Sequence, residues 1–136
     1  MDSKVIMFEK FAQQAAKRME ERKKQRTEQL LLKDMDCTVL EIRALSDKEV
    51  SECYEFSDDP LEIDKYTIYC ASKTLQEAAK VLVANGLLEE KQEYKITEIF
   101  TSLERNYIAK KVLTLSGVLG DAGIEVIEET KEIKNS

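Results

Sequence analysis

Three cysteines supply the only thiol groups of this 136-residue chain, and no histidine accompanies them. Cys37, Cys53 and Cys70 are widely spaced and form no C-x-x-C pair, so they lack the spacing of a zinc site or of a dithiol redox centre. Thiol activation and general acid–base catalysis both usually draw on histidine. We therefore expect reduced, mostly buried cysteines with a structural role, as is usual in intracellular proteins.

Carboxylates are abundant, but their arrangement favours helix caps and solvated surface over catalysis or metal binding. The run DDPLEID, at residues 58–64, lacks the glycine and the alternating ligands of a calcium loop. Acidic residues just before a helix are better explained as caps and as partners of the helix dipole. The neighbouring glutamates at 89–90 and 128–129 would point to different sides of a helix. Walker A, G-x-G-x-x-G and G-x-S-x-G motifs do not occur. We therefore predict no metal, no cofactor and no enzymatic activity.

The net charge of −6 is unevenly distributed along the chain. Residues 1–33 hold nine Lys and Arg against five acidic residues, a balance of +4, whereas the remainder holds 12 against 22, a balance of −10. An acidic body repels phosphate, and the acidic residues interleaved with the basic run 22–26 dilute its positive field. No apolar run approaches membrane-spanning length or forms the core of a signal peptide. We expect a cytosolic protein that binds neither nucleic acid nor membranes.

The elements that position these residues are predicted to be helical, since 4 Gly and 1 Pro leave few turns. The fold class is mainly α: a compact helical domain with a long N-terminal helix and at most one short strand or hairpin, at about residues 30–44. We divide the chain into an N-terminal amphipathic helix or arm (1–33), a helical core domain (34–120) and a charged C-terminal tail (121–136). The tail is predicted to be a marginal helix or a segment that orders on binding.

The predicted N-terminal helix covers residues 3–29 and can be capped by Ser3. Its apolar residues follow 3-4 spacing and so form one stripe, which ends at Met19, after which only charged and polar residues continue. Such a helix either projects to meet a partner or is an ordinary amphipathic helix with a frayed end, and the pattern leaves both open. The stripe is the predicted partner-binding surface, with Val5, Phe8, Phe11, Ala12 and Met19 as its candidate residues.

Further along, residues 38–43 alternate as a strand, and Leu30–Leu32 could pair with it. Ser46 and Glu49 fit a capping box for a helix over about 47–56. A single long helix is predicted from 61 or 64 to 85, then a short helix over 94–103 capped by Thr97, then a helix from 102 or 106 whose apolar stripe shifts register. Three tyrosines near these stripes are predicted to be buried: Tyr66, Tyr69 and Tyr107.

Four segments carry a resemblance to a known family. They are EIRALSDKE (41–49), the helix around Asp64-Lys65-Tyr66, EYKITEIFTSL (93–103) and VLTLSG (112–117), within about residues 37–135. In this order they resemble the tail assembly chaperones of PBSX-like prophages and related long-tailed phages. The chain departs from the family pattern at Val118, where an aromatic residue commonly follows L-S-G.

The resemblance implies a helical protein, encoded upstream of the tape measure protein, that coats this long, helix-rich partner and helps tail tube subunits gather on it. It implies a location in the cytoplasm of the bacterial host and absence from the mature virion. It also implies a longer form made by a programmed frameshift, of which this chain would be the short form. The alternative is a small helical adaptor or regulator that acts by protein–protein interaction, or as a homo-oligomer through its N-terminal helix.

Overall fold

The computed structural model describes residues 3–127, which are mostly helical with one two-stranded antiparallel hairpin. This confirms the predicted class, including the long N-terminal helix and the hairpin. The elements in chain order are α1 (Ser3–Lys23), β1 (Thr27–Leu32), the 3-10 turn η1 (Lys33–Met35), β2 (Thr38–Arg43), α2 (Asp47–Glu55), α3 (Pro60–Cys70), α4 (Lys73–Ala84), the 3-10 segment η2 (Glu93–Ile99) and α5 (Ser102–Leu115).

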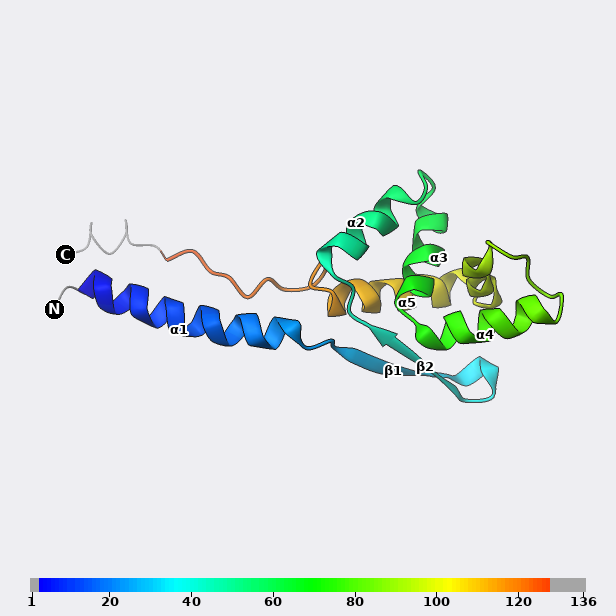
Figure 1. Cartoon of the computed structure of the whole chain (residues 1–136), viewed down its shortest axis with the longest axis horizontal. Helices are drawn as coiled ribbons and strands as arrows, with labels where there is room; N and C mark the ends of the chain where they lie inside the picture. The colour runs from blue at the N-terminus through cyan, green and yellow to red at the C-terminus, as the bar shows by residue number, and fades with distance from the viewer. Residues whose placement is uncertain (1–2, 128–136) are drawn as a thin grey trace.

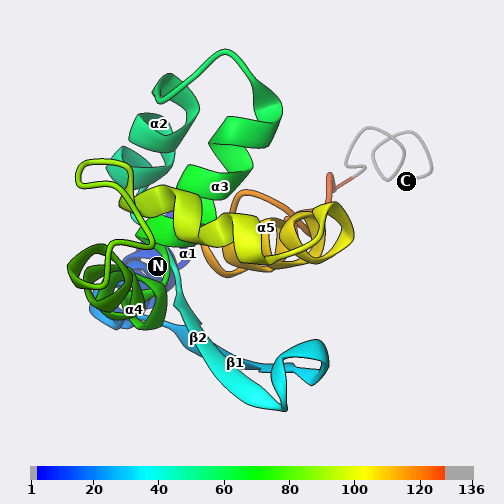
Figure 2. The same ribbon diagram turned by 90° about the vertical axis from the view of Figure 1, so that its right-hand side faces the viewer.

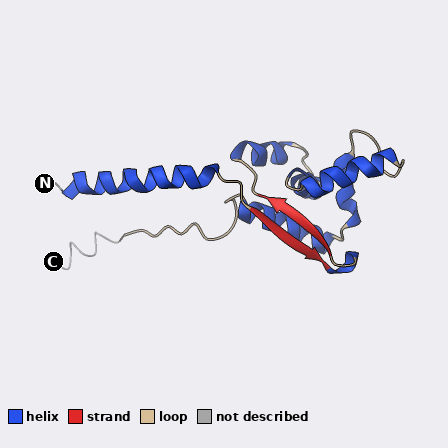
Figure 3. Cartoon of the chain, turned by 60° about the horizontal axis from the view of Figure 1, so that its bottom comes forward, coloured by secondary structure: helices blue, strands red, loops and turns tan. Residues whose placement is uncertain are grey.

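The molecule consists of a body, from β1 to α5, and an arm, α1, that projects from one end of it (Figure 1). Figure 2 shows α2 to α5 gathered on one side of the hairpin, whose turn stands away from them. The segment after α5 leaves the body at the same end as α1 (Figures 1 and 3). Residues 121–127 of the predicted tail are exposed and form neither helix nor strand, and the rest of that tail lies outside the described residues.

The hairpin pairs β1 with β2 in a register that sets Leu30 opposite Leu40. Alternation places Leu40 and Ile42 in the core and leaves Leu31 exposed on the other face. Because β1 starts at Thr27, the predicted helix over 3–29 is too long: α1 ends at Lys23. Strand pairing and the partial burial of Leu30 outweigh the helix propensity of the polar residues after Lys23.

The core joins the inner face of β2 to one side of each body helix. Its fully buried large apolar side chains are Leu40, Ile42, Ile68 and Val112. Around them pack further buried residues from α2, α4, η2 and α5 and from the residues that directly follow α3 and η2, namely Val50, Cys53, Ala71, Leu75, Ala79, Ile96, Phe100, Ile108 and Ala109. No residue of α1, from Ser3 to Lys23, belongs to this cluster. The body therefore has a core of its own that does not use the arm.

The single helix predicted from 61 or 64 to 85 is two helices, broken at Ala71 and Ser72. The buried Ser72 hydroxyl caps α4 by accepting a hydrogen bond from the Leu75 N–H at 3.3 Å. The Gln76 side chain donates to the Tyr69 carbonyl at 3.0 Å, which satisfies the end of α3. The apolar spacing continues across the break because both helices face the same core, so periodicity alone did not reveal it.

The short helix predicted over 94–103 is present in part, as the 3-10 helix η2, but it ends at Ile99. Thr97 is buried and caps no helix, since its hydroxyl donates to the Tyr94 carbonyl at 2.8 Å. The cap belongs instead to Thr101, which forms a reciprocal capping box with Glu104 at the start of α5. The capping box predicted at Ser46 and Glu49 is confirmed, and α2 runs from Asp47 to Glu55.

An ion pair between Arg43 and Glu49 ties β2 to α2 and α3. The two terminal guanidinium nitrogens, Nη1 and Nη2, donate to the Glu49 carboxylate at 3.0 and 2.6 Å, and Nη2 also donates to the Cys70 carbonyl at 3.2 Å. Hydrogen bonding from Arg43 and from the Ser46 N–H lowers the pKa of Glu49 from 4.5 to about 2. The carboxylate therefore stays ionised in the folded protein to much lower pH than in the unfolded chain.

This pair predicts a pH dependence of stability. Because the pKa of Glu49 is lower in the folded than in the unfolded protein, the ionised Glu49 adds to the free energy of unfolding. This contribution is complete above pH 4.5 and is lost as the pH falls through about 2. About a third of the Glu49 side chain is exposed, so we expect only about 1–2 kcal/mol from it. Between pH 7 and pH 2.5, the free energy of unfolding measured with urea should fall by this amount more in the wild type than in Glu49→Gln. An equal loss in both proteins would contradict the assignment.

Candidate protein-binding surfaces

The arm α1 is a 21-residue helix with no buried residue. Its predicted stripe is exposed throughout: Phe8, Phe11 and Met19 are 65%, 75% and 67% exposed, and Val5 and Ala12 are also classed as exposed. These five residues lie on one side of the helix, as their spacing requires. Nothing within residues 3–127 covers them. The structure thus places the predicted surface in the open.

The apolar surface of α1 is larger than its stripe. Ile6 and Met7 are exposed as well, and together with Val5 and Phe8 they place apolar side chains on all sides of the first turns. Sequence reasoning missed Ile6 and Met7 because they fall off the 3-4 spacing, although four consecutive apolar residues at a helix start were a signal. An uncovered apolar patch of this kind marks an interaction surface.

The root of α1 is held to the body by two hydrogen bonds on Arg26. Its guanidinium donates to the Leu115 carbonyl at the end of α5 at 2.8 Å, and its own carbonyl accepts from the Ala44 N–H at 2.8 Å. The connection between α1 and β1, residues 24–26, is therefore short and anchored. This fixes the point from which the arm leaves the body, beside the C-terminal end of α5.

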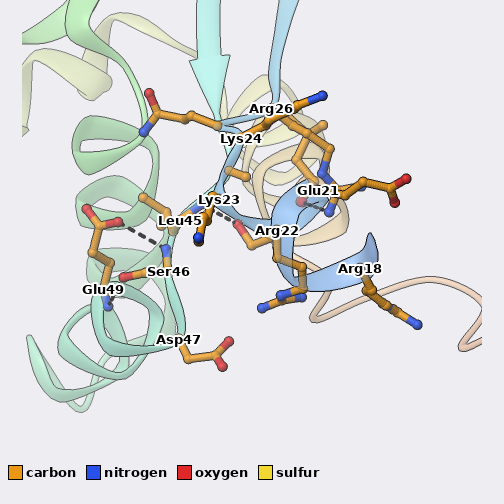
Figure 4. Close-up of a pocket in the computed structure, with 14 residues that line it drawn as sticks. Arg18, Glu21, Arg22, Lys23, Lys24, Arg26, Leu45, Ser46, Asp47 and Glu49 are labelled. Atoms are coloured by element: carbon orange, nitrogen blue, oxygen red, sulfur yellow. Dashed lines mark hydrogen bonds between the residues drawn. The ribbon is translucent and has the colours of Figure 1, made fainter. Parts of the chain in front are cut away.

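A cleft of about 730 Å³ lies at this root, between the last turns of α1 and the start of α2 (Figure 4). Its lining is mixed in charge: Arg18 and Arg22 come from α1, whereas Asp47 and Glu49 come from α2. Within residues 3–127, no ion pair crosses it. The carboxylates of Asp47 and Glu49 would repel an anion in the cleft. The Ser46 and Glu49 side chains already accept hydrogen bonds from N–H groups at the start of α2. The cleft is better explained as the space around the arm's attachment than as a ligand site.

A second, apolar hollow of about 430 Å³ lies between the far half of β1 and the first half of α5. We call it the β1/α5 groove; it is lined by Leu30, Leu31, Leu32, Lys33, Asp34, Leu103, Glu104, Tyr107 and Ile108. Leu103 is 82% exposed and Leu31 56% exposed, which is unusual for leucines beside a formed core.

Of the three tyrosines predicted to be buried, Tyr66 and Tyr69 are partly buried, but Tyr107 is exposed at the groove, so its predicted burial is wrong.

The thiols form no catalytic arrangement in the described part of the chain. Cys53 is buried and Cys70 partly buried, as predicted for most of the cysteines, but Cys37 is exposed in the hairpin turn, and all three are free. Hydrogen bonding between the two inner thiols lowers the pKa of Cys53 and, with burial, raises that of Cys70. Because Cys53 is only 2% exposed, a substrate cannot reach its sulfur.

Among residues 3–127, no three His, Cys, Asp or Glu side chains are grouped so that they could hold a metal ion. None of the helices in this part of the chain is both long and apolar enough to cross a bilayer.

Comparison with known proteins gave no matching protein family, curated protein or solved structure. The surfaces themselves are therefore the basis for a functional hypothesis.

Amide hydrogen exchange should distinguish the arm from the body. In dilute, monomeric protein we expect the amides of α1 to exchange at least about 100-fold faster than those of α5, because a helix without tertiary packing frays. Helix α5 is the internal control, since Ile108 and Val112 anchor it in the core. Equal protection of both helices would show that α1 is covered by its own body in solution.

Proposed function

We propose that this protein is a phage or prophage tail assembly chaperone that binds the tape measure protein, and that it helps recruit tail tube subunits to it. The observation that carries the proposal is the uncovered apolar face of α1. A folded body with its own core does not need such a helix for stability, so we assign the helix to binding. The resemblance of four segments to these chaperones supplies the partner.

The geometry of α1 suits a long, helix-rich client. At 1.5 Å per residue, 21 residues extend about 30 Å, and the stripe presents anchors at i, i+3, i+4 and i+7. This is the pattern by which an amphipathic helix packs along another helix or into an apolar groove. The acidic body would remain outside the contact and would oppose aggregation of the complex by charge repulsion.

The segment after α5 offers the client a second contact. Ile124, Val126 and Ile127 are exposed, and the segment leaves the body at the same end as α1 (Figures 1 and 3). A client lying along the arm would pass near both α1 and residues 121–127. Two weak contacts on one chain raise the overall affinity when the client can engage both at once.

The test is co-expression with the product of a neighbouring gene that encodes a very long helical protein. We expect this product to aggregate when made alone and to be recovered in a complex when made with the full-length chain. Co-expression of green fluorescent protein in place of this chain is the control, because making any second protein can lower the amount of client that the cell makes. If the gene's surroundings contain no long helical protein, or if one is present and fails to co-purify, the proposal is wrong.

A further inference from the structure

We infer that the β1/α5 groove receives the apolar face of α1 from a second copy of this chain, so that free chains associate arm to body. The inference concerns the protein without its client and does not depend on the function proposed above. Its basis is the presence, on one chain, of an uncovered apolar helix and an uncovered apolar groove that this helix cannot fill on its own molecule.

The groove is formed by elements that are already fixed in place. Its floor is continuous with the core through Leu30, which is partly buried, and Ile108, which is fully buried. An ion pair at 3.7 Å between Lys111 of α5 and Glu28 of β1 joins its two walls. Leu31 and Leu103 stand at its edges with most of their surface exposed. A ligand therefore meets a hollow that needs no rearrangement to bind.

Charge favours α1 as the occupant. The groove carries Asp34 and Glu104 against a single Lys33. It belongs to a body, residues 27–115, that holds 18 acidic and 11 basic residues. Helix α1 has the opposite sign, with six basic against three acidic residues over Ser3–Lys23. On the helix, Arg18 follows Ala15 by three positions and Arg22 follows Met19 by three, so basic groups flank the apolar face. The apolar face and its basic flanks match the groove and its acidic rim.

The same geometry makes the occupant a second copy. The arm is rooted at the C-terminal end of α5 through the Arg26–Leu115 hydrogen bond, whereas the groove lies at residues 103–108, about 15 Å along that helix. From its root α1 points away from the body (Figures 1 and 3). To reach its own groove it would have to reverse at residues 24–26 and release both hydrogen bonds of Arg26. A neighbouring molecule's groove is accessible without that change.

The consequence is a protein that shields its own apolar arm until a client competes for it. Each chain has one arm and one groove, so two chains can exchange arms or the contact can continue from chain to chain. Client binding and self-association then use the same face of α1 and exclude one another. Adding client should therefore dissociate the self-associated form.

The experiment is light scattering coupled to size exclusion over about 1–200 µM full-length protein. We expect the wild type to be a dimer or larger at the upper end. An arm variant, Phe8→Asp with Phe11→Asp, and a groove variant, Leu31→Asp with Leu103→Asp, should each stay monomeric. All four positions are exposed, so folding should be kept, which circular dichroism verifies. The control variant, Val81→Asp with Leu87→Asp, adds the same charge at exposed positions outside the groove and should associate as the wild type does.

Mixing the two monomeric variants gives the decisive result. The groove variant keeps an intact arm and the arm variant keeps an intact groove, so the mixture should form a 1:1 heterodimer and nothing larger. A monomeric wild type at 200 µM would overturn the inference. So would a groove variant that still associates, because arms would then pair with arms, and so would a mixture without heterodimer. None of these results bears on whether the protein binds a client.

Discussion

Replacing Phe8 and Phe11 by aspartate is expected to weaken binding of the long helical client at least about 100-fold while leaving the melting temperature of the dilute, monomeric protein unchanged. Burying each phenylalanine should contribute about 1.5–3 kcal/mol to the complex, and two such losses exceed the 2.7 kcal/mol that corresponds to 100-fold. Stability should not change because α1 contributes no residue to the core. Co-purification at increasing salt and a thermal melt measure the two effects.

The matched control for this variant is Gln13→Asp with Gln14→Asp. It adds the same charge to the same helix, but at 100° per residue both positions lie away from the apolar stripe. We expect its client binding to stay within about threefold of the wild type, in the range of exposed substitutions. If both variants lose binding equally, charge rather than the apolar face is responsible, and the assigned surface is wrong.

Ile68→Ala should destabilise the body by about 3–4 kcal/mol. Ile68 is completely buried on α3, at the centre of the packing between α3, η2 and α5, so truncation leaves a cavity that the neighbours fill only in part. The control is Leu61→Ala on the same helix, where the leucine is 59% exposed and the cost should stay below about 1 kcal/mol. Urea unfolding followed by circular dichroism gives both values. Similar losses for the two variants would contradict the placement of the core.

Local patterns in the sequence predicted most elements of the body. Alternation revealed β2, and the capping box at Ser46 and Glu49 placed the start of α2 correctly. The end of α1 was missed because no glycine or proline marks it, and good helix formers continue beyond Lys23. What ends the helix is the pairing of β1 with β2, whose residues lie 6 to 16 positions further along the chain, and local propensity does not report such a contact. The break at Ser72 was hidden for a similar reason, since both helices face one core.

The candidate binding surfaces were only partly predictable. Periodicity identified the stripe of α1 but left open whether the body covers it, because a stripe looks the same whether it is buried or exposed. The β1/α5 groove could not be predicted at all. It combines residues 30–34 with residues 103–108, which are distant in sequence and share no motif, and it exists only because the hairpin lies along α5.

The most direct test of the account is amide hydrogen exchange of α1 in the purified complex with the long helical client, compared with dilute free chain. We predict that the amides around Phe8 and Phe11 slow by at least about 100-fold in the complex, because the client covers the apolar face and stops the helix from fraying. Amides of α5 should change little, since they are already protected by the core. Protection of the body with no change in α1 would contradict the central claim that the arm binds the client.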